Sequence, residues 1–486
     1  MGSSAPYRRR GSAGARDRRA GGTAGHGAWR AEAMIALVPL LVAGLLLAGS
    51  STVTRIADGR LARRAAVSFA AAATALSIVL PLVCRYAPFA GARTADLVMV
   101  ALPDGAARPV ATVTCVVGLL VVAMSPIASH PPATLAGILR LLAISSGSVV
   151  VRDGGVAAVL WALSAWLVWA ELRRRDSGDG LDRLFAMYHV PSVLFFGVGT
   201  ALTAAGSPET GTALVVLGTV IRSAVIPVHG WYPRFVERAP LGVVVAFGAA
   251  PLGVLTQLEL LSARSPGALA HEVALIGGLT AVAAAVFGVV QNSARRALAF
   301  LAMSQSGLIA FGLGNGSPVA VSGAVLTWQA SALALSGTAM ALAALEARRG
   351  TLSLAAPGGN FARTPRLAAA FLLCGLAAVG FPPSLGFAGG HLLVHGSAGE
   401  FPLLWPALIG AVGVNGMTVM RSFFALFTGS RVHRGERDLR PLEACALMVV
   451  VTALLLGAVL PVIPVPHVPA AGSERSDRRT AQPVDP

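Results

Sequence analysis

The segment Val220–Pro240, VIRSAVIPVHGWYPRFVERAP, decides how the rest of the chain is interpreted. It places a charged side chain, Arg222, in an apolar run, and Pro227 then removes a backbone hydrogen-bond donor from the same run. If such a run crosses a membrane, the freed carbonyl groups and the guanidinium cannot face lipid, because lipid offers them no polar partner. The segment therefore predicts a broken helix that lines protein or a water-filled cavity.

The composition around this segment is that of a membrane protein. Hydrophobic residues make up 55% of the chain, charged residues 12%, and the mean hydropathy is +0.71. A soluble domain carries about 25% charged residues. Apolar runs close to 20 residues long repeat along the sequence, which is the length a helix needs to cross the hydrocarbon layer. We therefore expect an all-α fold, a polytopic helical bundle in the lipid bilayer.

Fourteen apolar runs predict about fourteen transmembrane helices within residues 34–464. The expected ranges are 34–53, 65–83, 110–129, 133–150, 155–171, 185–206, 210–229, 240–262, 270–292, 297–315, 317–346, 366–395, 403–428 and 441–464. The Arg-rich segment 1–33 and the tail 465–486 lack apolar periodicity, so we expect both to be disordered. Segment 1–33 carries seven arginines, and Met34 is an alternative start of the protein.

The distribution of arginines predicts the orientation in the membrane. Loops after odd-numbered runs hold 20 arginines, and loops after even-numbered runs hold 5. Because cytoplasmic loops carry the excess of positive charge, the odd-numbered loops are expected in the cytoplasm. Both termini then lie outside the cytoplasm, and we expect a multi-pass protein of the bacterial inner membrane.

The net charge of +16 does not indicate nucleic-acid binding, and no nucleic-acid partner is expected. The arginines lie between apolar runs, without a basic stripe interleaved with aromatic residues. The four cysteines lack CxxC spacing, and the sequence contains no iron–sulfur, flavin or nucleotide motif. No metal or cofactor is therefore predicted, and any redox centre would belong to a partner.

Four stretches resemble the antiporter-like membrane subunits of respiratory complex I, Mrp-type cation/proton antiporters and membrane-bound hydrogenases. The resemblance covers about residues 110–430, and the matching positions are Arg222, Ala224, Pro227, His229, Trp231, Pro233, Ala239 and Pro240, then Arg295 and Arg296, then Pro382, Pro383, Gly386 and Phe387, and finally Arg421. It implies two inverted repeats, with breaks in helix seven at Pro227 and in helix twelve at Pro382 and Pro383. Arg421 is then expected to anchor helix packing.

The chain departs from that family at the titratable positions that the resemblance implies for an ion pathway. The family glutamate in helix five falls at Ala162, the lysine in helix seven at Arg222, and the lysine in helix eight near Gly253. The lysine in helix eleven falls near Ser336, and the acidic position in helix twelve at Gly390 or His391. Arginine stays protonated at any accessible pH, so we expect Arg222 to be a fixed charge and not a proton carrier.

Histidines are the remaining candidates for proton chemistry, because their charge changes near neutral pH. The ion-pathway candidates are Arg222, His229, His391 and His189, with His395 as a further position. Each histidine has a structural alternative. His229 can cap backbone carbonyl groups at a helix end, and His189 and His395 can serve polar packing or an interface.

We interpret the chain as a non-redox membrane subunit of a complex I-like, NADH-quinone oxidoreductase-like or Mrp-like assembly. It would support proton or monovalent cation translocation, driven by other membrane subunits, without catalytic residues of its own. Two alternatives stay open. The first is a transport-inactive structural scaffold or the membrane half of an inorganic-carbon uptake complex. The second is a standalone cation/proton antiporter, which the departures at Ala162 and Gly253 disfavour.

Overall fold

The computed structural model describes residues 22–86, 107–151, 153–175, 178–262, 267–359, 361–429 and 436–459. Their regular structure is helical, apart from an isolated bridge between Ser293 and Ser353. The first helices are α1 (Gly22–Thr54), α2 (Gly59–Tyr86), α3 (Ala107–Met124), α4 (Pro132–Ser148), α5 (Gly154–Arg174), α6 (Leu181–Ala204), α7 (Pro208–Arg222), α8 (Tyr232–Arg238) and α9 (Leu241–Gly248). The others are α10 (Leu252–Ser262), α11 (Ala268–Val289), α12 (Ala294–Gly314), α13 (Pro318–Arg349), the 3-10 turn η1 (Phe361–Arg363), α14 (Pro365–Ala378), α15 (Leu385–Ser397), α16 (Trp405–Phe427) and α17 (Pro441–Val459).

Each of the fourteen predicted apolar runs contains a helix or a pair of helices. The structure has eight helical segments long and apolar enough to cross a membrane, and four shorter apolar helices. The all-α, multi-pass membrane architecture that the composition predicts is therefore confirmed. Helix α1 begins at Gly22 and not near Met34, so its first turns lie within the segment that we expected to be disordered. Residues 1–21 and the tail 465–486 lie outside the described residues.

Two predicted helices differ from the observed ones, and a predicted break in a third is present. The predicted run 210–229 ends as a helix at Arg222, so Pro227 follows the end of α7 and does not interrupt it. The predicted run 240–262 is split into α9 and α10, because Pro251 lacks the N–H that a continuous helix would need there. The predicted break at Pro382 and Pro383 is present, between α14 and α15.

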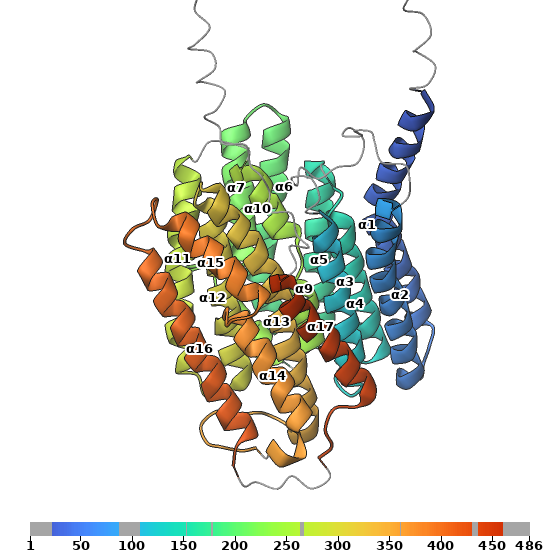
Figure 1. Ribbon diagram of the computed structural model, residues 1–486, viewed down its shortest axis with the longest axis vertical. Coiled ribbons are helices and arrows are strands. Elements are labelled where there is room, and N and C mark those ends of the chain that lie inside the picture. Colours follow the sequence, from blue (N-terminus) through green and yellow to red (C-terminus); the bar gives the residue numbers. More distant parts are fainter. Residues whose placement is uncertain are drawn as a thin grey trace, which may run out of the picture.

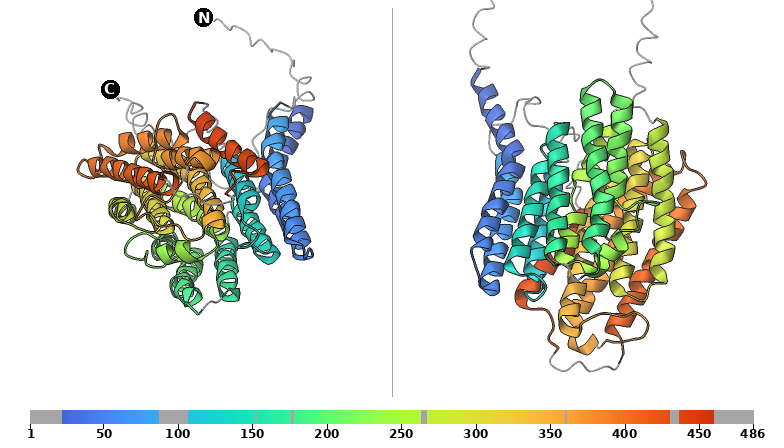
Figure 2. Two further views of the ribbon diagram at one scale, coloured as in Figure 1. Left: turned by 90° about the horizontal axis from the view of Figure 1, so that it is seen from below. Right: turned by 180° about the vertical axis from the view of Figure 1, so that it is seen from behind.

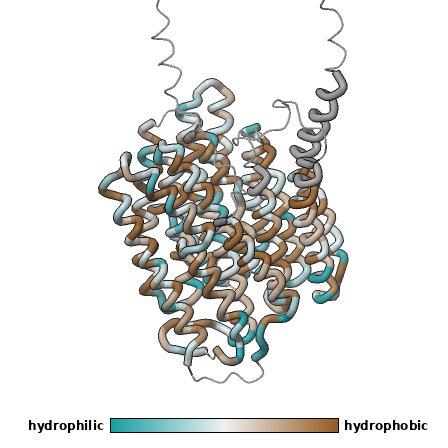
Figure 3. Tube along the Cα trace, in the orientation of Figure 1, coloured by the Kyte–Doolittle hydropathy of each residue, from teal (hydrophilic) through white to brown (hydrophobic). Residues whose placement is uncertain are grey.

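The helices form a bundle in which most axes run in a similar direction (Figure 1). Helices α1 and α2 lie at one edge with α3 and α4 beside them, and α11 and α16 lie toward the opposite edge (Figures 1 and 2). The long helix α13 is buried along nearly its whole length, as expected for a helix that is apolar on all sides. Hydrophobic residues cover most of the bundle, and hydrophilic ones gather mainly near the helix ends (Figure 3).

Ion pairs join the Arg-rich segments that follow odd-numbered apolar runs. Within the described ranges the pairs are Arg63–Glu443, Arg174–Glu171, Arg175–Glu171, Arg238–Asp179, Arg295–Glu346, Arg296–Glu237, Arg348–Glu443 and Arg349–Glu436. Each pair connects residues in, or next to, the loops that carry most of the arginines. Segments that are far apart in the sequence are therefore cross-linked at one end of the bundle by electrostatic contacts.

Candidate functional site

The segment between α7 and α8 is a break in a helical path. Helix α7 ends at Arg222, and α8 begins after the N-cap residue Trp231. Polar groups freed by the break find partners within the protein. The Trp231 Nε1–H donates to the Ile221 carbonyl oxygen at 3.1 Å, and the Ile226 N–H donates to Thr280 Oγ1 at 3.0 Å. The break is thus held inside the bundle, as backbone at membrane depth requires.

An aromatic cluster packs against this break from α6, α8 and α9. It consists of Phe185, His189, Trp231, Phe235 and Phe247. The His189 ring stacks on Phe185 with centroids 3.7 Å apart and meets the edge of Trp231 at 4.4 Å. His189 Nδ1 lies 3.0 Å from the Phe185 carbonyl oxygen, whereas its buried Nε2 has no partner in the described part of the chain. His189 therefore packs within the aromatic cluster against Trp231 and Phe247.

Arg222 reaches from the end of α7 across to α5 and α9. One guanidinium nitrogen donates to Ser164 Oγ at 2.7 Å. The guanidinium carbon lies 4.6 Å from the centre of the Trp161 ring and 3.9 Å from the centre of the Phe247 ring. Stacking of a guanidinium on aromatic faces is an attractive electrostatic contact. Within the described residues the partners of Arg222 are therefore a hydroxyl group and two aromatic rings.

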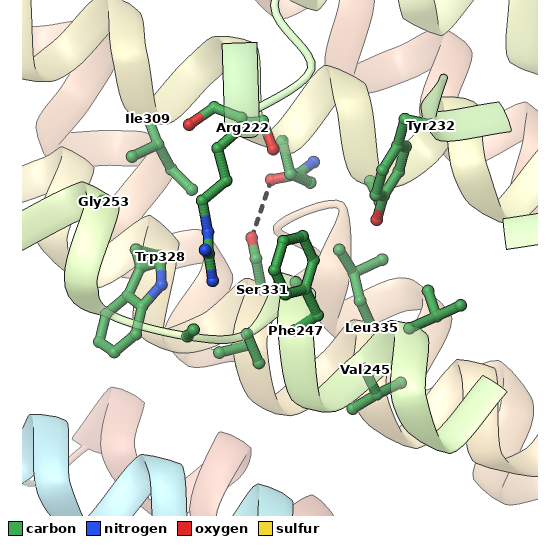
Figure 4. A pocket seen from close by; sticks show the side chains of 18 of the residues that line it. Arg222, Tyr232, Val245, Phe247, Gly253, Ile309, Trp328, Ser331 and Leu335 are labelled. Atoms are coloured by element: carbon green, nitrogen blue, oxygen red, sulfur yellow. Dashed lines mark hydrogen bonds between the residues drawn. The ribbon is translucent and has the colours of Figure 1, made fainter. Parts of the chain in front are cut away.

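Arg222 also lines a cavity of about 130 Å³ between α7, α9, α10, α12 and α13. Figure 4 shows its side chain extending into the space that Trp328, Ser331, Phe247 and Tyr232 also line. Further polar lining comes from Gln257, Gln305, Ser306 and Ser336. A cavity of this volume, with this many polar groups, has room for several water molecules.

Two of the positions where the family resemblance implies a lysine fall at this cavity. Gly253, where the resemblance implies a lysine, lines it, and a Cβ built there would lie 3.5 Å from the Trp161 ring. Ser336, the counterpart of a second lysine, lines it too. The cavity lining contains no lysine, aspartate or glutamate. Arg222 is consequently the one charged side chain that the cavity lining holds.

The second break lies apart from this cavity. Gly386 allows α15 to approach α14 closely, because a Cβ at that position would meet the Ala377 carbonyl oxygen. His391 and His395 lie on an exposed face of α15, with ring centroids 6.3 Å apart, and Phe387 is on the same face. His391 was predicted as part of an ion pathway together with Arg222, and the structure does not bring the two residues together around one cavity.

The remaining predicted motif residues have structural contacts. Arg295 makes two 2.7 Å contacts with the Glu346 carboxylate and donates to the Ala239 carbonyl oxygen at 2.7 Å, which ties α12 to α13 and to the end of α8. Arg296 pairs with Glu237 at 3.6 Å. Arg421 donates to the carbonyl oxygens of residues 289 and 291, at 2.8 and 2.6 Å, so it joins α16 to the end of α11.

The last three motif residues shape the chain around the break. Pro233 is buried in the first turn of α8, and Pro240 precedes the first residue of α9. His229 lies in the break with a buried Nδ1 that has no partner in the described ranges, and its carbonyl oxygen accepts from the Tyr232 N–H at 3.0 Å.

Sequence reasoning missed several residues that complete the site. Ser164, Phe247 and Gln305 carry no motif signal, because each is an ordinary small, apolar or amide residue within an apolar run. Their importance comes from contacts across the bundle, such as the one between Ser164 and Arg222, which are 58 positions apart. No group of three metal-ligating side chains occurs in the portion of the chain that the structure describes.

Comparisons with known proteins give the site a context. Residues 184–415 match the family model described as NADH:quinone oxidoreductase/Mrp antiporter, TM. The chain is 27% identical over 326 residues to NADH-quinone oxidoreductase subunit 14 of Thermus thermophilus, covering 63% of this chain and 72% of that protein. It is 26% identical over 271 residues to NADH-quinone oxidoreductase subunit N of Heliobacterium modesticaldum, covering 54% of this chain and 56% of that protein. The chain thus spans about half the length of several of its curated relatives.

Solved structures share the fold over most of the chain. A chain of the Mrp complex from Dietzia sp. superposes with a TM-score of 0.75 at 16% identity, covering 88% of this chain and 94% of that chain. A chain of respiratory complex I from Thermus thermophilus superposes with a TM-score of 0.73 at 21% identity, covering 88% and 95%. At these identities the likeness concerns the fold alone.

Proposed function

Because residues 184–415 place this chain in the NADH:quinone oxidoreductase/Mrp antiporter family, as a divergent, antiporter-like membrane subunit, we propose that it supports proton or monovalent cation translocation within a multi-subunit membrane assembly. The observation that carries the proposal is the cavity at the break between α7 and α8. A polar cavity beside interrupted helices is the arrangement that membrane transport proteins use for ion and water pathways.

The translocation is driven by a partner in this proposal. The described cavity lining holds a fixed charge, Arg222, but no lysine or carboxylate that could release a proton near neutral pH. His189 touches two aromatic residues that line the cavity, Trp231 and Phe247, and is a candidate for proton exchange. Ion movement here would therefore depend on residues and energy that other subunits supply.

A transport-inactive scaffold is the second candidate, and the same cavity favours it. Gly253 and Ser336 stand where the family resemblance implies lysines, and neither side chain can carry a charge. On this alternative the breaks and Arg222 preserve the fold and a binding surface for other subunits, and no ion moves. A standalone cation/proton antiporter is less well supported, because it would need titratable groups of its own.

We also propose the detailed architecture of the membrane domain. The proposed domain has fourteen crossings, two inverted repeats and both termini outside the cytoplasm. In this arrangement α7–α8 and α14–α15 occupy corresponding positions in the two repeats. Two features support this arrangement. Each of these two paths is broken, and the loops after odd-numbered apolar runs hold most of the arginines. The ion-paired end would then face the cytoplasm of a bacterial cell.

The orientation can be tested with reporter fusions. Alkaline phosphatase and green fluorescent protein fused in turn after Arg174, Arg296 and Arg434 should all report a cytoplasmic location, because these loops carry most of the arginines. Fusions after Gly206, between α6 and α7, serve as the control and should report the opposite side. Two of the three Arg-rich sites reporting a periplasmic location would overturn the orientation.

The function itself can be tested by reconstitution. We expect the chain to co-purify with the membrane proteins encoded next to its gene, and the complex to change the internal pH or sodium content of liposomes when its partner is energised. The matched control is the same complex with this chain omitted. Co-purification without any flux would support the scaffold, and flux from this chain alone would support the standalone antiporter.

A further inference from the structure

The cavity beside Arg222 holds a positive charge without a negative partner in the described ranges. None of the ion pairs there includes Arg222, and no aspartate or glutamate lines the cavity. A charge buried at membrane depth is unfavourable unless it is paired or hydrated, and such residues mark ion sites. This chain's described side chains supply no counter-charge to Arg222, so water or a bound anion in the cavity must meet its charge.

The contacts that Arg222 does make use only part of its hydrogen-bonding capacity. Guanidinium has five N–H donors in a planar fork, and the described contacts occupy one of them, the bond to Ser164 Oγ. Trp161 and Phe247 lie against its faces, so the rings take no N–H bond in the guanidinium plane. The edge of the fork that points into the cavity remains available to a ligand (Figure 4).

Other groups around the cavity offer further hydrogen-bond donors. Gln305 Oε1 accepts from Ser331 Oγ at 3.2 Å, and the NH₂ group of Gln305 is a further donor at the cavity. The Tyr232 hydroxyl and the Trp328 indole N–H line the same space and have no acceptor within the described ranges. Gln257 differs, because its amide nitrogen donates to Thr219 Oγ1 at 2.8 Å. A positive charge surrounded by spare donors is complementary to an anion.

We infer that this cavity binds a small monovalent inorganic anion of the chloride class, with Arg222 as its counter-charge and Gln305, Tyr232 and Trp328 as neutral donors. The cavity volume of about 130 Å³ admits an ion of that size together with water. Binding an anion balances the fixed charge of Arg222 in this low-dielectric setting. The inference stands independently of the proposed function, because it concerns the chain alone and requires no partner or ion flux.

The test is anion-dependent stability of the full chain purified in detergent. The protein is exchanged into sodium gluconate and titrated with sodium chloride at constant ionic strength, and the unfolding midpoint is followed by intrinsic fluorescence. A saturable rise of about 2–4 °C is expected, because a ligand that binds only the folded state stabilises it. Arg222→Gln should abolish the dependence on chloride, and Arg222→Lys should retain it.

The control variant is Arg363→Gln, which removes the same charge from an exposed position far from the cavity and should keep the full chloride response. The inference is overturned if chloride has no effect on the unmodified protein, or if Arg222→Gln responds as the unmodified protein does. If Arg222→Gln does not fold, bromide-soaked crystals of the unmodified chain decide the question. An anomalous peak is expected within hydrogen-bonding distance of the Arg222 guanidinium, and its absence overturns the inference.

Discussion

Glu436→Gln is expected to lower the free energy of unfolding by about 3–5 kcal/mol, because it leaves the buried charge of Arg349 without its counter-charge. Arg349 Nε donates to Glu436 Oε1 at 2.7 Å, and the two side chains are only 4% and 1% exposed. Arg349 also donates to the Leu426 carbonyl oxygen at 2.6 Å, so the guanidinium cannot swing out to water without losing a second bond. Among the eight ion pairs this one is the most deeply buried.

The measurement is unfolding of the full chain in detergent, by heat or by a titration with dodecyl sulfate. Arg238→Gln is the matched control, because it removes the Arg238–Asp179 pair, whose side chains are 50% and 23% exposed. That change should have a much smaller effect, because exposed ion pairs are screened by solvent. Replacing both partners, Arg349→Met with Glu436→Leu, should be more stable than Glu436→Gln alone, since no lone charge remains. Equal effects of Glu436→Gln and Arg238→Gln would contradict this account.

Arg222 is the position with the second large expected effect. Arg222→Ala should impair assembly or stability, because it removes a charged hydrogen bond to Ser164 and the stacking on Trp161 and Phe247. The charged hydrogen bond contributes about 1.5–3 kcal/mol. The stacking on the aromatic rings contributes about 2 kcal/mol. Removing a desolvated cation offsets part of that loss, so the net destabilisation is smaller than the sum. Arg222→Lys keeps the charge and should retain assembly and leave any ion flux roughly intact.

Both variants are purified with their partners. The yield of the complex and the ion flux in liposomes are then measured for each. On our account the alanine variant loses yield, and flux falls in proportion to the amount of complex that forms. A complex that assembles normally with Arg222→Ala but moves no ions would assign Arg222 a direct role in transport. It would also contradict our interpretation of Arg222 as a fixed structural charge.

Much of the fold was predictable because the length of an apolar run can be read directly from consecutive residues. Each apolar run leads to a helix, and Pro382 and Pro383 mark a break that the structure contains. The split at Pro251 was missed, since one proline in an otherwise apolar run also fits a kinked, continuous helix. Pro227 was placed within a helix that ends at Arg222, because boundaries are harder to read from sequence than the presence of a helix.

The site was less predictable than the fold. The family resemblance drew attention to Arg222 and Trp231, and both lie at the cavity. The same resemblance drew attention to His391, which the structure places on an exposed helix face. The partners of Arg222 could not be found from the sequence, because Ser164 and Phe247 become significant only when α5 and α9 pack against α7. Such long-range pairing leaves no periodic or spacing signal along the chain.

The ion-paired end of the bundle also has a consequence for biosynthesis. Glu443, at the start of the last helix, pairs with Arg348 of α13 and lies 3.9 Å from Arg63 of α2. During translation Arg63 is therefore made more than three hundred residues before the carboxylate that it lies next to in the folded protein. A product that stops short of α17 carries two arginines without their shared carboxylate, so α17 is needed to complete the ion pairs at this end of the bundle.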